Sequence, residues 1–110
     1  MPNSHRPTIS THVLDTGSGQ PAPGVRVICS LLEADRVQAA GGGLTDDDGR
    51  IRDVLEGREL VPGVYRLSFE LGPDRFFEAA TIDFRIDDVE RSYHVPLLVA
   101  PFGLSSYRGS

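Results

Sequence analysis

Residues 64–71 read Val-Tyr-Arg-Leu-Ser-Phe-Glu-Leu, and from Tyr65 onward apolar and polar side chains alternate. A period of two places Tyr65, Leu67 and Phe69 on one side of an extended chain and the charged side chains on the other. Residues 81–87 repeat this pattern. Both segments are therefore predicted to be β-strands with one apolar and one polar face.

The rest of the chain divides into further short extended segments separated by connections rich in Gly, Pro and Asp. About seven or eight short strands in one small chain favour an all-β sandwich. A turn or so of helix is expected only near residues 73–79, where a proline can occupy the first turn. The other predicted strands are residues 8–15, 25–32, 36–40, 50–54 and 91–99, and the predicted loops are residues 17–24, 41–49 with the glycine run 41–43, and 59–63.

The length and composition indicate one compact domain. A chain of 110 residues that is 39% hydrophobic has no room for a second core. We expect residues 1–7 to form a flexible tail and residues 8–110 to form the domain. The single cysteine, Cys29, excludes an internal disulfide, and its apolar surroundings predict a small buried side chain.

Charge and hydropathy argue against two classes of partner. The net charge is −5, and the eleven basic residues are scattered arginines, which argues against a nucleic-acid-binding surface. The polar N-terminal residues contain no apolar run typical of a secretory signal or a membrane span. We therefore expect a cytoplasmic protein that does not bind membranes.

Two of the three histidines fall in predicted strands, whereas His5 lies in the polar tail and is expected to be solvated. Alternation places His12 on the opposite face from Thr11, and His94 on the opposite face from Tyr93. If the larger apolar sets face the core, both imidazoles point outward beside apolar neighbours, and such a face usually needs a cover. From their positions alone, surface histidines that merely form hydrogen bonds are the simpler interpretation.

Arg50 follows a turn of three aspartates and a glycine, residues 46–49. Its guanidinium could form a surface ion pair with an aspartate, or bind a substrate carbonyl through its planar fork of donors. The turn lacks the ligand spacing and the later glutamate of a calcium loop. Two histidines without a third ligand are a weak zinc signal, and a serine nucleophile elbow is absent. No metal site is predicted.

Four ordered segments carry a family resemblance: residues 11–16 (THVLDT) before a Gly- and Pro-rich turn, residues 45–50 (TDDDGR), residues 93–101 (YHVPLLVAP) and the terminal residues 107–110 (YRGS). Together they span nearly the whole chain. They resemble the 5-hydroxyisourate hydrolases of the transthyretin-like family. Transthyretin proper shares the fold but lacks the terminal tetrapeptide and the histidine pattern.

The resemblance implies a transthyretin-like sandwich of two four-stranded sheets in a homotetramer, a dimer of dimers with active sites between the dimers. The family's helix is expected to be short or absent, because residues 72–80 are fewer than in the family pattern. The implied reaction needs no cofactor or metal. It is the hydrolysis of 5-hydroxyisourate to 5-hydroxy-2-oxo-4-ureido-2,5-dihydro-1H-imidazole-5-carboxylate, in urate degradation after urate oxidase.

The resemblance also implies the roles of the site residues. His12, or His12 with His94, would accept a proton from the attacking water. Arg50 and Arg108 would hold the substrate carbonyls and the developing negative charge. Ser110 would orient a histidine or the water through its hydroxyl or its carboxylate. The implied catalytic residues are His12, Arg50, His94 and Ser110, and the implied substrate-binding residues are His12, Arg50, Tyr107, Arg108 and Gly109.

Two other classes of function remain open from the sequence. A transthyretin-like protein could carry a small ligand in a channel without catalysis, and it would then tolerate loss of the histidines. An interaction domain could use outer-face apolar residues such as Leu14, Ile28 and Leu98 for association only. Deletion of residues 107–110 separates the classes, because only the enzyme gives those residues chemical work.

Overall fold

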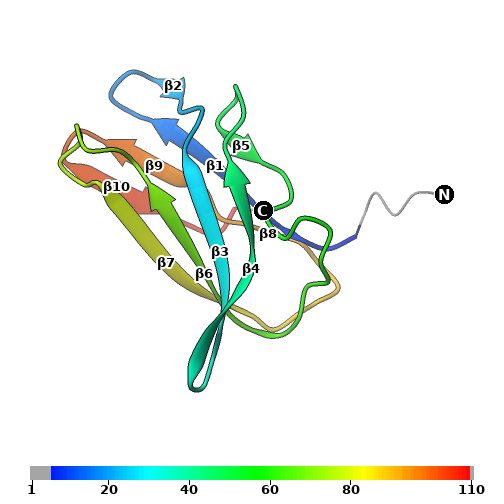
Figure 1. The fold of residues 1–110 in the computed structure, drawn as a ribbon. Coiled ribbons are helices and arrows are strands. Elements are labelled where there is room, and N and C mark those ends of the chain that lie inside the picture. The colour runs from blue at the N-terminus through cyan, green and yellow to red at the C-terminus, as the bar shows by residue number, and fades with distance from the viewer. Residues whose placement is uncertain (1–5, 110) are drawn as a thin grey trace.

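The computed structural model describes residues 6–109, and this part of the chain is a two-layered β-sandwich without a helix (Figure 1). The predicted all-β sandwich is confirmed. No helix of the described residues is long and apolar enough to cross a membrane. The strands are β1 Ile9–Asp15, β2 Gln20–Pro21, β3 Arg26–Glu33, β4 Arg36–Leu44, β5 Arg50–Ile51, β6 Gly63–Glu70, β7 Ala79–Ile86, β8 Tyr93–His94, β9 Leu97–Ala100 and β10 Gly103–Ser106.

One sheet has four antiparallel strands in the order β4-β3-β6-β7. The alternation seen in the sequence of β6 sets its faces, because Tyr65, Leu67 and Phe69 are buried while the residues between them are partly exposed. β3 repeats this arrangement with Val27 and Cys29. The inward side chains of this sheet form one half of the core.

The second sheet contains six strand segments rather than the expected four. β10, β9, β1 and β2 follow one another, while β5 and β8 pair with other parts of β1. The predicted strand 91–99 is interrupted because Pro96 has no N–H to donate to the ladder. It becomes β8 and β9, which both run parallel to β1.

The glycine run 41–43 was predicted to be a loop, and this prediction is wrong. The run lies in β4 opposite Val27, Ile28 and Cys29 of β3, next to a register shift between Cys29 and Ser30. At Gly41 a Cβ atom would lie 1.9 Å from the Val54 carbonyl oxygen. Glycine is needed here because another backbone segment passes too close for any side chain.

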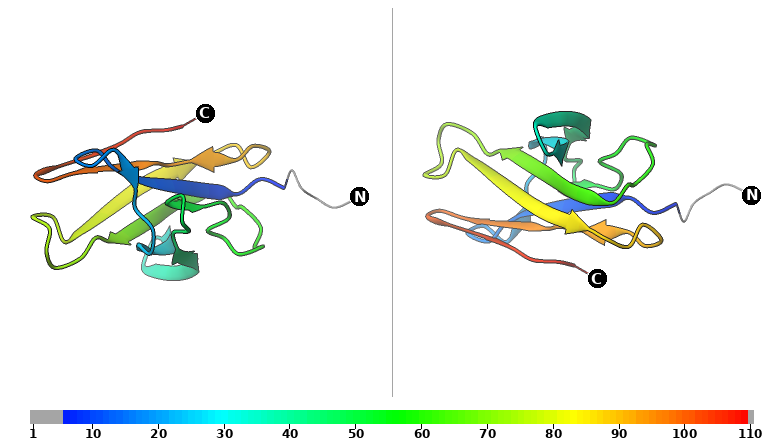
Figure 2. Two further views of the ribbon diagram at one scale, coloured as in Figure 1. Left: turned by 90° about the horizontal axis from the view of Figure 1, so that it is seen from above. Right: turned by 90° about the horizontal axis from the view of Figure 1, so that it is seen from below.

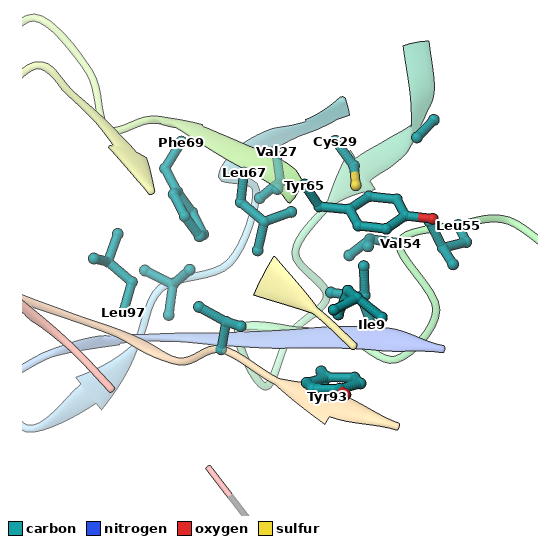
Figure 3. Packing of buried hydrophobic residues seen from close by; sticks show 14 of the residues in the cluster. Ile9, Val27, Cys29, Val54, Leu55, Tyr65, Leu67, Phe69, Tyr93 and Leu97 are labelled. Carbon is teal, nitrogen blue, oxygen red and sulfur yellow. The ribbon is translucent and has the colours of Figure 1, made fainter. Parts of the chain in front are cut away.

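The core lies between the two layers (Figures 2 and 3). Tyr65, Phe69 and Leu67 from one sheet pack toward Ile9 and Leu97 from the other, and all five are buried. Cys29 is fully buried among them, as predicted. Its burial raises the pKa of the thiol to about 12. The C-terminal segment runs along the outer side of the layer that contains β1 (Figure 2).

The segment between β6 and β7 forms turns rather than a helix. Residues 1–5 of the predicted tail, including His5, lie outside the described residues. Arg6, within the predicted tail, donates a hydrogen bond to the Asp53 carboxylate at 2.8 Å.

Candidate active site

The outer face of β1 carries the site. Ser10 and His12 are two residues apart and point away from the core, whereas Ile9, Thr11 and Val13 are buried. In the ladder, His12 lies opposite Arg50 of β5, and Ser10 lies beside His94 of β8. The short strands β5 and β8 therefore bring Arg50 and His94 to the two sides of β1.

A hollow of about 400 Å³ opens in this region. It contains polar and charged groups from three strands and the turn before β8. Its lining residues are Ser10, Thr11, Arg50, Ile51, Arg52, Ser92, Tyr93 and His94.

His94 is held on two sides. Its Nδ1 atom lies 2.8 Å from the Ser10 hydroxyl oxygen. On the other side, a Cβ atom at Gly109 would lie 2.6 Å from His94 Cδ2. The Gly109 N–H also donates to the His94 carbonyl oxygen at 2.8 Å. Gly109 therefore fits against the imidazole only because it has no side chain.

The pKa of His94 is lowered, mainly because burial disfavours the charged imidazole. The positive charge of Arg50, and then His12, lower it further, while a hydrogen bond to the Ser10 backbone opposes them. The imidazole is thus neutral at pH 7 and has a lone pair available to accept a proton.

His12 is oriented by the acidic turn. Its Nε2 atom lies 2.8 Å from the Asp48 carbonyl oxygen, and because a carbonyl can only accept, Nε2 carries the proton. The turn is closed by the Asp46 carboxylate, which accepts the N–H groups of Asp48 and Arg50. These hydrogen bonds, chiefly that from Arg50, keep the pKa of Asp46 low. In the structure, the acidic residues 46–48 therefore stabilise the turn that precedes Arg50.

None of the ion pairs among residues 6–109 involves Arg50. Arg50 is half-buried and lines the hollow. Arg52 lies on the same face of the same segment and also lines the hollow.

The C-terminal residues divide between two places. Gly109 touches His94, but the Arg108 guanidinium lies 4.7 Å from the centre of the Tyr93 ring. Tyr107 is 56% exposed, and with Arg108 it lines a second hollow beside Phe84 of β7. Ser110 lies outside the described residues. Of the residues singled out in the sequence, Arg50 and His94 line the first hollow. His12 lies opposite Arg50 in the ladder and Gly109 contacts His94, whereas Tyr107 and Arg108 line the second hollow.

Sequence reasoning missed Ser10 and the Asp48 carbonyl. Ser10 carries a detectable signal, since the period of two places it on the same face as His12. The role of the Asp48 carbonyl follows from the turn conformation, which residue types do not specify. Among the described residues, no group of three or more His, Cys, Asp or Glu side chains is arranged to hold a metal ion.

Comparisons with known proteins identify the family of this chain. The family model described as "HIUase/Transthyretin family" matches residues 9–109. A 5-hydroxyisourate hydrolase of Caulobacter vibrioides is 39% identical, over 93% of this chain and 97% of the relative. The structure of Klebsiella pneumoniae 5-hydroxyisourate hydrolase is 38% identical, with a TM-score of 0.79 over 94% of this chain and 99% of that one.

Transthyretin, which is not named as a hydrolase, has the same fold. Transthyretin from Sparus aurata is 26% identical, with a TM-score of 0.83 over 94% of this chain and 97% of that one. The family model and the C. vibrioides relative both cover more than nine-tenths of the present sequence. This chain therefore belongs to the HIUase/Transthyretin family.

Proposed function

We propose that this protein is a 5-hydroxyisourate hydrolase, which opens the six-membered ring of its substrate in urate degradation. The observation that carries the proposal is that Arg50 and His94 line one hollow, with His12 opposite Arg50 in the ladder. Relatives named 5-hydroxyisourate hydrolase at 38–39% identity support the same activity. The product is 5-hydroxy-2-oxo-4-ureido-2,5-dihydro-1H-imidazole-5-carboxylate.

The reaction adds water across an amide-like bond. A neutral imidazole takes a proton from water while the water oxygen attacks the ring carbonyl, and the carbonyl–nitrogen bond then breaks. The proton passes to the departing nitrogen, and the carbonyl carbon ends as a carboxylate. His12 and His94 are the candidate bases, since both imidazoles lie on the outer face of the sheet and His94 lines the hollow.

The developing negative charge needs fixed donors. Arg50 supplies them in the proposed mechanism, because its guanidinium lies at the hollow without a carboxylate partner among residues 6–109. Arg108 can assist only if it leaves the Tyr93 ring or reaches a neighbouring copy. Ser110 completes the proposed set as an orienting group for a histidine or for the water.

The active form in this proposal is a homotetramer in the cytoplasm. The outer face with the histidines is open in the single chain, and a second copy over it would exclude water and strengthen the electrostatic contacts. The single buried thiol, Cys29, fits a reducing compartment.

The test generates 5-hydroxyisourate from urate with urate oxidase and follows its ultraviolet decay with and without this protein. We expect faster decay, and we expect His12→Asn and His94→Asn to abolish the acceleration while the assembly stays intact. Decay at the spontaneous rate would favour a ligand carrier instead, like the sea bream transthyretin whose structure contains thyroxine. Full activity in both histidine variants would reject the catalytic assignment.

A further inference from the structure

The Ser10 side chain forms a hydrogen bond with the His94 ring, although Ser10 lies outside the four sequence segments that resemble the hydrolases. The two residues are 84 positions apart, and the parallel pairing of β1 with β8 places them side by side. The Ser10 hydroxyl oxygen is 2.8 Å from His94 Nδ1. This contact lies on the outer face of the sheet, at the wall of the hollow.

The hydrogen bond with Ser10 uses Nδ1 and leaves Nε2 as the other nitrogen of the ring. A serine hydroxyl can accept from an N–H or donate to a bare nitrogen, so the 2.8 Å contact fits both neutral tautomers. Only the tautomer in which Nδ1–H donates to the Ser10 hydroxyl oxygen puts the lone pair on Nε2, as a base at this nitrogen requires.

His94 lines the hollow, and its Nε2 atom forms no hydrogen bond with residues 6–109. Gly109 presses against the neighbouring Cδ2 atom and leaves little room for the ring to turn over. The imidazole is therefore held by Ser10 at one edge and by Gly109 at the other.

We propose that Ser10 is a positioning residue that fixes His94 as the Nδ1-protonated tautomer, so that Nε2 is the base that accepts the proton of the attacking water. This inference rests on the proposed hydrolase function. The water proton moves to Nε2. The resulting imidazolium keeps its proton on Nδ1 and still donates it to the Ser10 hydroxyl oxygen. The Nε2 proton then passes to the ring nitrogen that leaves the carbonyl carbon.

The kinetic test compares Ser10→Ala with Ser10→Thr, which keeps a hydroxyl. We expect Ser10→Ala to lower kcat about tenfold, the effect of one hydrogen bond, with KM within about twofold. The acidic limb of the Ser10→Ala pH profile should shift to lower pH, because the imidazolium loses a hydrogen-bond acceptor. Ser10→Thr should have the kcat and the pH profile of the wild type. Ser68→Ala, a serine on the outer face of the other sheet, is the matched control and should match the wild type.

The tautomer is measured separately by long-range ¹H–¹⁵N NMR of the imidazole, which needs no substrate. We expect His94 in the wild type and Ser10→Thr to show an Nδ1–H signal pattern, and Ser10→Ala to show a mixture. An Nε2–H pattern in the wild type, or wild-type kcat and pH profile in Ser10→Ala, would overturn the role of Ser10. An inactive wild type with the expected tautomer would instead overturn the hydrolase proposal and leave the hydrogen-bond assignment standing.

Discussion

His94 shows how one residue's surroundings set its chemistry. Burial and the charge of Arg50 lower its pKa, so the neutral form persists to lower pH than for a free histidine. A base that must be deprotonated then stays active below the usual histidine range. The acidic limb of the kcat/KM profile is expected below the limb that an unperturbed imidazole gives.

Replacement of Arg50 by Gln tests the electrostatic part of this effect. Removal of a positive charge favours the imidazolium, so the NMR titration midpoint of His94 is expected to move upward. The same variant should lose about a hundredfold or more in kcat, because the oxyanion loses a donor. Arg26→Gln, on the other sheet, is the control for general charge effects. An unmoved midpoint in Arg50→Gln would contradict the proposed coupling.

Cys29 gives a second prediction at the residue scale. The thiol is fully buried, and burial raises its pKa to about 12, so almost no thiolate is present at pH 8. We expect no reaction with a thiol reagent such as DTNB in the native protein, and one thiol per chain after unfolding in guanidinium. Rapid labelling of the native protein would show that the core opens near β3.

The site was only partly predictable from single residues. The period of two was sufficient to place His12 and His94 on outer faces, and the acidic turn drew attention to Arg50. The contact between Ser10 and His94 depends on the parallel register of β1 and β8, which the sequence does not state. The position of Arg108 over Tyr93 likewise depends on the path of the last residues.

At the scale of the elements, β4 depends on glycine where it passes other backbone. Gly42 has a φ of 144°, and a Cβ atom there would lie 2.3 Å from the Val27 carbonyl oxygen. We expect Gly42→Ala to destabilise the protein by more than about 2 kcal/mol in urea unfolding, through strain and a lost ladder contact. Gly103→Ala is the matched control, since its nearest neighbour would be 4.0 Å away. Equal stability of the two variants would refute the steric argument.

The strands themselves were more predictable than their ends. Long alternating segments such as β6 and β7 were predicted within a residue or two, because one face of each is buried. β4 extends through the glycine run 41–43, whose composition is typical of a loop. The run is extended because it pairs with β3 and passes close to the backbone of residue 54. β5 is limited to two residues because the chain turns into the core at Val54 and Leu55.

For the whole molecule, the class and the two layers followed from the alternation, but the sheet order did not. β1 pairs with four other strands because short segments from distant parts of the chain share its length. Direct neighbours are β2 and β9 at one end, and β5 and β8 at the other. The site lies where these non-local pairings meet, so local sequence patterns cannot specify it completely.

The proposed assembly makes a prediction about the open face. Leu14 and Leu98 are ladder partners whose side chains point outward, on the face that carries His12. If a second copy covers this face, Leu98→Arg places an unpaired charge in the contact. We expect the mass in solution to fall from about four times the 12.0 kDa chain to that of a dimer or monomer, and the activity to fall with it.

Ile28→Arg separates this effect from a general response to surface charge. Ile28 is 45% exposed on the outer face of the other sheet, away from the histidines. The Ile28→Arg variant should remain a tetramer by analytical ultracentrifugation and keep its activity in the ultraviolet assay. If Leu98→Arg instead remains a tetramer with full activity, the histidine face is not the contact between copies, and the water-excluding cover must come from the chain's own last residues.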